Sequence, residues 1–329
     1  MRKGPFETKF MEAQIENYRE KLWHIFPIPD LNCLVDFYTH SANDARVLQL
    51  PFIVALGIMI PMDKTLGVLS SQTHSGEDLE ELFRWMSDTR DEIESSTSTL
   101  PMVRALLLAA LCYQYDGSIE RASDCFEKAK AKFNDILCFF GGLDGLEDRL
   151  PDDDFCDLAM TSWDFAKYEQ FFAFLDLTDN RSSFVPLMHL NLGMVQERYG
   201  RQAGEVLLKR QSWINFQNQA SGLECSSVAS EPLLAMLRSF KALEVPENLT
   251  SGEVSYPIAY FECVHCCAYI YRQAVFIYQS LPYDAQQALY LELSQCTENY
   301  RDLVRRAREQ WETLQNLERS RLMALGIFD

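Results

Sequence analysis

The stretch LPMVRALLLAALCYQYDGSIERASDCFEKAKAKF, residues Leu100 to Phe133, contains two helical patterns separated by one short turn. The first pattern is rich in leucine and ends at Asp116–Ser118, where the sequence Asp-Gly-Ser favours a turn. In the second pattern, small and apolar residues recur every three or four positions: Ala122, Cys125, Phe126, Ala129, Phe133, Ile136 and Leu137. Two helices joined by so short a turn are expected to lie antiparallel. The stretch therefore predicts a helical hairpin.

Helical spacing of apolar residues recurs along the rest of the chain, whereas strand patterns are scarce. The clearest example is the last helix, with Leu289, Leu293, Cys296, Tyr300, Leu303, Ala307, Trp311 and Leu314 three or four positions apart. We predict an all-α fold, a large single-domain bundle of about ten to twelve helices. An N-terminal helical half, 1–140, and a C-terminal helical half, 155–329, are expected to pack together as one domain.

The N-terminal segments show where helices begin and end. A helical pattern that starts near Met11 is expected to stop at Pro27, because proline interrupts helical hydrogen bonding. Asp30 is expected to cap the short helix that follows. The segment from Val47 to Ile60 is apolar on nearly every side, which predicts a helix in the centre of the fold.

Composition limits the classes of function. The chain has 329 residues, of which 47% are hydrophobic, so it is long enough to bury a large core. Its formal net charge of -18, from 48 acidic and 30 basic residues, repels phosphate backbones and argues against direct binding of nucleic acid. The longest apolar runs are far shorter than the roughly 20 residues of a membrane-spanning helix, so no membrane association is expected. The ten cysteines are expected to be free and mostly buried, as in a protein of the nucleus or cytoplasm.

The stretch PDDDFCD contains the one arrangement of acids that invites a metal-site hypothesis. Asp153, Asp154 and Asp157 are spaced like the magnesium ligands of class I terpene synthases, which hold carboxylates one helical turn apart. Such enzymes also need a second ligand cluster on a facing helix, and the segment NLGMVQERYG lacks the required hydroxyl and leading acid. Acids also gather at helix starts because they offset the positive end of the helix dipole. A helix start is the preferred interpretation, and a magnesium-dependent synthase is the alternative.

Other reactive residues form no recognisable catalytic arrangement. The sequence CVHCC, Cys263 to Cys267, has no second ligand pair at the spacing that zinc sites use, so it is interpreted as buried thiols on an apolar helix. No serine or cysteine stands in a nucleophile motif, and no glycine-rich phosphate loop follows a strand. We expect no catalytic residue, no resident metal and no cofactor.

The hairpin also resembles one tetratricopeptide unit. Ala105, Ala109, Ala122, Tyr113 and Gly117 supply the small and aromatic positions of such a unit. A stacked repeat needs at least three copies to bury a continuous core, and one copy is convincing here. A tetratricopeptide-like adaptor is therefore a further alternative.

Several segments, taken in order, resemble the regulatory region of fungal transcription factors, called the middle homology region. The segment LWHIFPIPDLNCLVDFY is similar to its histidine- and proline-containing element, and LPFIVALGIMI is similar to its apolar helix. The matching positions are His24, Phe26 and Pro27 in the first segment, Ala55, Leu56 and Gly57 in the second, and Trp163, Glu169 and Asp176 in a later aromatic helix. The hairpin from Val103 to Leu137 is similar to the helix pair between them. The resemblance covers most of Leu22 to Asp179, although the arginine pair of the family's aromatic helix is missing.

The resemblance implies a transcription regulator or co-regulator, or a regulatory domain that responds to a ligand or partner, for a fungal metabolic gene cluster. The expected location is the nucleus, with the cytoplasm as the alternative. Family members carry zinc-cluster or zinc-finger DNA readers ahead of this region, whereas the residues before Leu22 contain no cysteine. The expected partners are therefore transcription machinery or a DNA-binding protein, and a small-molecule effector stays open. The last helix and the loops Asp63–Gly76 and Gly141–Asp154 are the expected contact elements.

Overall fold

The computed structural model describes most of the N-terminal two thirds of the chain and part of the remainder. The described residues are 6–23, 26–41, 44–59, 76–116, 118–142, 146–176, 188–205, 207–208, 275, 278–279, 281–299, 301–302 and 305. Helices account for 84% of them, and no strand occurs among them, so the all-α prediction is confirmed.

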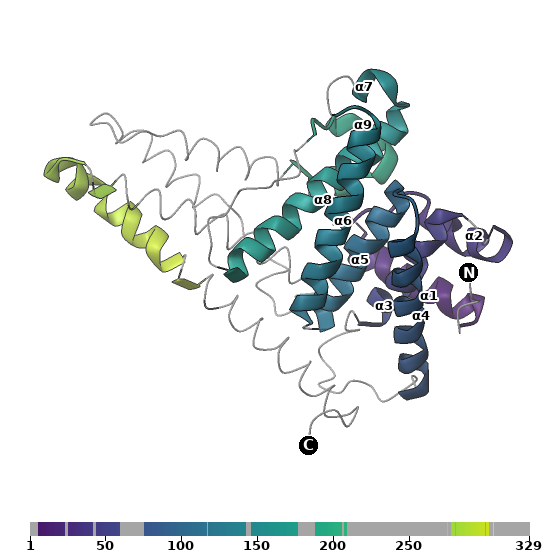
Figure 1. Ribbon diagram of the computed structural model, residues 1–329. Helices are drawn as coiled ribbons and strands as arrows, with labels where there is room; N and C mark the ends of the chain where they lie inside the picture. The colour runs from purple at the N-terminus through teal and green to yellow at the C-terminus, as the bar shows by residue number, and fades with distance from the viewer. Residues whose placement is uncertain are drawn as a thin grey trace. The chain divides into compact units, whose positions relative to one another are not determined.

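Eleven helices have defined bounds within these ranges (Figure 1). They are α1 (Thr8–Lys21), η1 (Leu31–Cys33), α2 (Leu34–His40), η2 (Ala45–Gln49), α3 (Leu50–Met59), α4 (Gly76–Ser95), α5 (Leu100–Asp116), α6 (Ile119–Phe139), α7 (Leu146–Arg149), α8 (Asp152–Asp176) and α9 (Leu192–Tyr199). None of the described helices is by itself long and apolar enough to cross a membrane, although the bent pair Leu31–His40 and Ala45–Met59 together meets the criteria of length and composition.

The chain divides into two compact units. Unit 1 comprises residues 1–168, 182–204 and 317–329, and unit 2 comprises residues 169–181 and 205–316. The expected halves 1–140 and 155–329 remain a prediction. In unit 2, residues 283–299 are helical, with Leu289 and Cys296 buried as the spacing of the last helix predicts.

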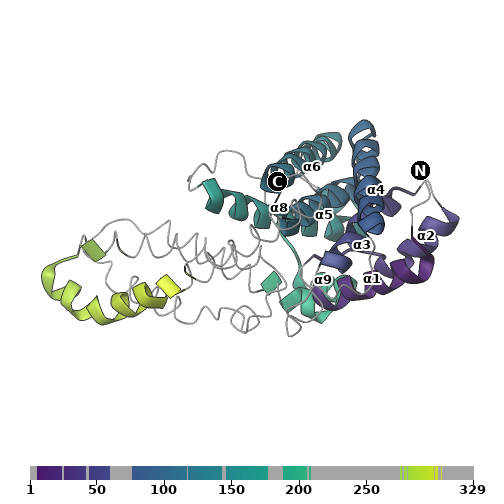
Figure 2. The same ribbon diagram turned by 90° about the horizontal axis from the view of Figure 1, so that it is seen from below.

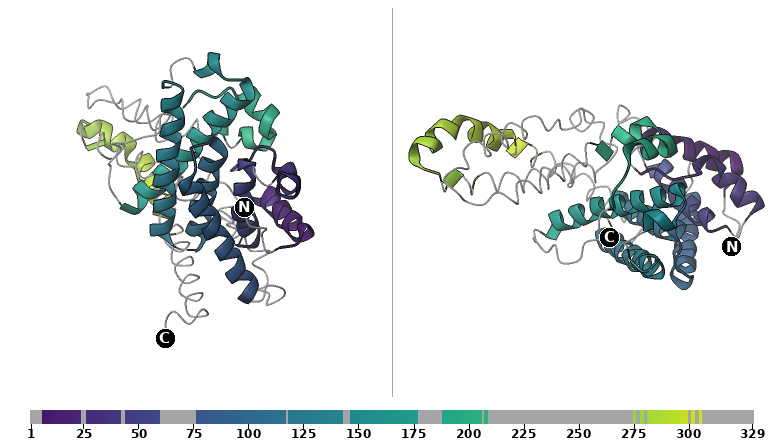
Figure 3. Two further views of the ribbon diagram at one scale, coloured as in Figure 1. Left: turned by 45° about the vertical axis from the view of Figure 1, so that its right-hand side comes forward. Right: turned by 90° about the horizontal axis from the view of Figure 1, so that it is seen from above.

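The hairpin of α5 and α6 is the centre of unit 1. The two helices run side by side in every view, as the short turn between them requires (Figures 1 and 3). The stripe of α6 is buried at Ala122, Cys125, Phe126, Ala129, Phe133 and Leu137. Aromatic rings join α6 to α8, with the ring centroids of Phe133 and Phe165 5.0 Å apart and those of Phe126 and Tyr168 5.7 Å apart. These contacts remove a large apolar area from water and hold α8 against the hairpin.

The apolar helix α3 occupies the interior, as the sequence predicts. Every residue from Leu50 to Gly57 is buried, and α3 lies between α1 and α5 (Figure 2). Gly57 allows α1 to approach closely, because a Cβ at this position would overlap the backbone carbonyl of Gln14. This pairing of α1 with α3 skips α2 and η2, whereas tetratricopeptide units pair neighbouring helices. The adaptor alternative remains a prediction for the whole chain.

The expected cap at Asp30 is wrong. Asp30 has a left-handed backbone, and its side chain makes no capping hydrogen bond to the short helix that follows. Its carboxylate instead accepts a hydrogen bond from Arg46 at 2.9 Å. The carboxylate is therefore used in a contact with a distant residue, which a local capping pattern does not contain.

Candidate functional site

The aspartates of PDDDFCD lie at the start of α8 and point to different environments. Asp152, Asp153 and Asp154 are exposed in the first turn, where their charges offset the positive end of the helix dipole. Asp157 lies one turn later and is buried, with 7% of its surface exposed. The three aspartates that the spacing groups together are thus not equivalent: Asp153 and Asp154 face solvent, and Asp157 faces the interior.

Asp157 is clasped by Arg198 of α9. The Nε and Nη2 groups of Arg198 donate to the two carboxylate oxygens of Asp157 at 2.9 and 2.8 Å. The remaining guanidinium nitrogen donates to Asp153 at 3.1 Å. Such two-pronged arginine–carboxylate pairs are among the strongest hydrogen-bonded contacts in proteins, so they orient both side chains.

Arg104 approaches the same carboxylate from α5. Its guanidinium is buried and lies 3.7 Å from Asp157. It donates to the Thr161 hydroxyl at 3.0 Å, to the backbone carbonyl of Asp157 at 2.7 Å and to the Tyr199 hydroxyl at 3.0 Å. The Tyr199 hydroxyl in turn donates to Asp157. We call Arg104, Asp157, Thr161, Arg198 and Tyr199 the Asp157 network, and all five belong to unit 1.

The charges of this network are set by its contacts. Burial alone would raise the pKa of Asp157, but the hydrogen bond from Arg198, the charge of Arg104 and the hydrogen bond from Tyr199 together lower it. Burial would lower the pKa of Arg104, but Tyr199, Asp157 and Asp164 hold it above its ordinary value. Burial raises the pKa of Tyr199. At neutral pH the network therefore contains one carboxylate, two guanidinium groups and a neutral phenol.

The Asp157 network has the chemistry of a structural brace. It ties α5, α8 and α9 together, although α9 is far from α5 in the sequence. Every oxygen of Asp157 that could accept a hydrogen bond is engaged by an arginine or a tyrosine. A magnesium ion at Asp157 would have to displace Arg198. Among the described residues, no group of three or more histidine, cysteine, aspartate or glutamate side chains could hold a metal ion.

The synthase alternative remains a prediction, and this geometry favours the helix-start interpretation. The segment NLGMVQERYG, in which a second metal-ligand cluster was sought, supplies Arg198 and Tyr199 to the aspartates instead. The sequence did contain a signal for Arg104, because it is the only charged residue within LPMVRALLLAALC. A buried arginine implies a carboxylate partner, but nothing local indicates which one. The sequence CVHCC lies outside the described residues.

The lowered pKa of Asp157 predicts how stability depends on pH. Unfolded aspartate titrates near pH 3.9, so the network stabilises the fold fully above about that pH and loses its contribution as the pH falls through the lower folded pKa. We expect the difference in unfolding free energy between the natural protein and Asp157→Asn to stay constant from about pH 7 to 5 and to shrink below about pH 4. Urea unfolding of both proteins at each pH measures it. A difference that grows towards acid pH would contradict the assignment.

A second feature of unit 1 is an apolar groove of about 690 Å³. It lies between the connection from α4 to α5, the C-terminal part of α6, and the start of α8. Its apolar lining comes from Leu100, Ile136, Phe139, Phe140, Leu150 and Leu158. Phe139, the last residue of α6, is 85% exposed, and its ring meets that of Phe140 edge-on with centroids 5.4 Å apart. An aromatic side chain left this exposed beside other apolar groups is a typical element of an interaction surface.

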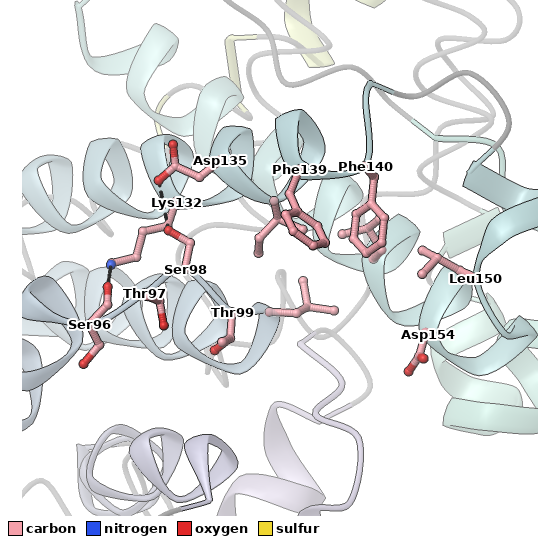
Figure 4. A pocket seen from close by; sticks show the side chains of 13 residues that line it. Ser96, Thr97, Ser98, Thr99, Lys132, Asp135, Phe139, Phe140, Leu150 and Asp154 are labelled. Carbon is pink, nitrogen blue, oxygen red and sulfur yellow. Dashed lines mark hydrogen bonds between the residues drawn. The ribbon is translucent and has the colours of Figure 1, made fainter.

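Polar side chains lie at both ends of this groove. Figure 4 shows Ser96, Lys132 and Asp135 at one end, Leu150 and Asp154 at the other, and the rings of Phe139 and Phe140 between them. The ammonium of Lys132 donates to the Ser96 carbonyl at 2.8 Å, and Ser98 donates to Asp135 at 2.9 Å. Of the expected contact elements, the loop Gly141–Asp154 thus contributes to the groove. The loop residues 63–75 and, in the last helix, residues 300, 303–304 and 306–314 lie outside the described residues.

Comparison with known proteins yields no match. No protein-family model, no curated protein and no solved structure matches this chain.

Proposed function

We propose that this chain regulates transcription as a co-regulator that acts through protein contacts, with its DNA-binding partner supplied by another chain. The observation that carries the proposal is the apolar groove of unit 1, where Phe139 is exposed between acidic residues. Such a surface can bury apolar area against a partner, and its charge attracts basic proteins and repels nucleic acid.

The resemblance of Leu22 to Asp179 to the regulatory region of fungal transcription factors supports the finer part of the proposal. Three features of unit 1 agree with what that resemblance implies: an interior apolar helix at LPFIVALGIMI, a helical hairpin at Val103 to Leu137, and a buried Trp163. The proposed setting is the nucleus of a fungus and the regulation of a metabolic gene cluster. The proposed partners are transcription machinery or a DNA-binding protein.

A tethering experiment tests the proposal. The full chain is fused to an unrelated DNA-binding domain and expressed in a fungal cell with a reporter gene under the matching operator. We expect reporter expression to differ from that given by the DNA-binding domain alone, because the fusion places the chain at the promoter. Equal expression from the fusion and the domain alone would contradict the proposal.

A binding experiment complements the reporter. With its net charge of -18, the chain is expected not to bind duplex DNA at physiological salt, because counterion release requires basic side chains at the phosphates. Fluorescence anisotropy of a labelled duplex against the purified chain measures this. Salt-sensitive binding of the duplex would show that the chain reads DNA itself and would overturn the co-regulator assignment.

A further inference from the structure

We propose that the groove of unit 1 binds an amphipathic helix of a partner protein, one that carries large apolar side chains on one face and basic side chains beside them. The inference rests on the proposed function and deepens it by naming the chemistry of the partner. It follows from three properties of the groove: its apolar centre, its acidic edge and its openness.

The apolar centre supplies the anchor. Phe139 is 85% exposed, and Ile136, Phe140 and Leu150 around it are half-buried, whereas Leu158 is fully covered. The groove therefore has a closed floor and an accessible aromatic wall. Large apolar side chains that pack against this wall are removed from water together with Phe139. Contacts of this kind contribute most of the affinity in peptide-binding grooves.

The acidic edge determines the charge of the partner. Asp154 lines the groove, and four further acids of α7 and the first turn of α8 are exposed: Glu147, Asp148, Asp152 and Asp153. Arg149 is the one basic residue in this segment, and its guanidinium donates to the Phe140 carbonyl at 2.8 Å. At the opposite end, the Lys132 ammonium is already bonded to the Ser96 carbonyl. These bonds leave both positive charges in place, and Asp153 is paired with Arg198, but the other four acids outnumber Arg149 and Lys132. The net charge beside the groove is therefore negative, which favours lysine or arginine on the partner.

The openness of the groove favours a helix over a small molecule. Sites for small molecules enclose most of the ligand surface, whereas the main aromatic group here faces solvent. A volume of about 690 Å³ is enough for a few large side chains that project from one face of a helix. The rest of such a helix would stay in solvent, where its basic residues meet the acidic edge.

The test is direct binding of a probe to the full chain. The probe is a dye-labelled helical peptide of about 16 residues with leucines at positions i, i+3, i+4 and i+7 and lysines at most other positions. We expect saturable binding by fluorescence anisotropy that weakens as salt is raised. Phe139→Ala is expected to weaken binding about tenfold or more, because it removes the aromatic anchor. Since Phe139 is exposed, this variant should fold normally, which circular dichroism checks.

Matched controls separate the groove from general attraction between a basic peptide and an acidic protein. Tyr283→Ala removes an aromatic ring that is 72% exposed in unit 2 and should leave binding unchanged. Asp154→Asn should weaken binding more than Glu120→Gln, which removes an equal charge at the exposed start of α6 away from the groove. A peptide with glutamate in place of every lysine should bind far more weakly.

Two results would overturn the inference. One is binding that is equally strong in Phe139→Ala and the natural protein. The other is a change of oligomeric state in Phe139→Ala by sedimentation velocity, which would assign the groove to a second copy of this chain. This outcome can be distinguished from that of the reporter experiment. A change in reporter expression without peptide binding would reject only the binding of a helix at the groove. Peptide binding without a change in reporter expression would reject only the transcriptional role.

Discussion

Asp157→Ala is expected to lower the free energy of unfolding by about 3–5 kcal/mol, the largest effect of any single substitution proposed for this chain. The variant leaves the buried guanidinium of Arg104 without the carboxylate that neutralises it and leaves Arg198 without its two-pronged partner. A buried charge without a partner loses its solvation and gains nothing in return. Urea unfolding followed by circular dichroism measures the loss.

Asp153→Ala is the matched control, because Asp153 lies one turn earlier on α8 and contacts the same arginine. Its side chain is 72% exposed, so its pair with Arg198 is an ordinary surface ion pair. We expect a change within about 1 kcal/mol. Similar losses for the two variants would show that Asp157 is not the centre of the network.

Incubation of the natural protein and of both variants with magnesium and farnesyl diphosphate tests the synthase alternative. Product that the natural protein forms and Asp153→Ala does not form would assign these aspartates to catalysis.

A double substitution examines why Asp157 matters. Arg104→Met combined with Asp157→Leu removes the charge at both buried positions, and Arg198 is 23% exposed in its side chain and able to reach solvent. We expect the double variant to be more stable than Asp157→Ala, because the guanidinium of Arg104 is no longer buried without the carboxylate of Asp157. A double variant that is less stable would show that the network contributes through hydrogen bonds to Thr161 and Tyr199 instead.

Gly57→Ala is expected to lower the free energy of unfolding by about 2 kcal/mol or more, although alanine is the better helix former. The added Cβ would overlap the Gln14 carbonyl and lie 2.9 Å from the Gln14 Cβ, so α1 would have to move away from α3. Both groups belong to packed helices and neither is the end of a flexible side chain. Thermal and urea unfolding measure the effect.

Gly193→Ala serves as the comparison for Gly57→Ala. Gly193 is also helical, but its added Cβ would meet only the side-chain oxygen of the capping residue Asn191, at 3.1 Å. The gain in helix propensity and the disturbance of this cap are each about 1 kcal/mol, so the net change should be small. Equal losses at the two glycines would contradict a close approach of α1 at Gly57.

Much of unit 1 could be predicted from local patterns. The stripe of α6, the short turn before it and the apolar segment of α3 each identify a helix and the face that it buries, because helical periodicity depends on neighbouring residues alone. The end of α1 was predicted less well, since the helix ends at Lys21 and not at Pro27, and the contact of Asp30 with Arg46 was not predicted. Asp30 pairs with Arg46 through space, and this competes with the local capping bond that its position favours.

The candidate sites could be predicted only in part. The acids at the start of α8 were identified, but their spacing could not show that Asp157 turns inward while Asp153 and Asp154 face solvent. No sequence pattern predicted the groove, because Phe139 and Phe140 lie at the end of an amphipathic helix pattern and Leu150 lies in a segment that is otherwise polar. Their juxtaposition depends on how α6 ends and where α8 begins in space.

The sequence by itself determined the helical class of this protein, its interior helix and its acidic surface, because these follow from composition and from periodicities of three and four residues. Only the tertiary structure decided that Arg104, Asp157 and Arg198 meet, and that Phe139 stays uncovered beside a row of acids. Arg104 and Asp157 are 53 positions apart along the chain, Asp157 and Arg198 are 41 positions apart, and the exposure of Phe139 depends on how α6 ends. Their energies depend on burial and distance, which no local pattern specifies.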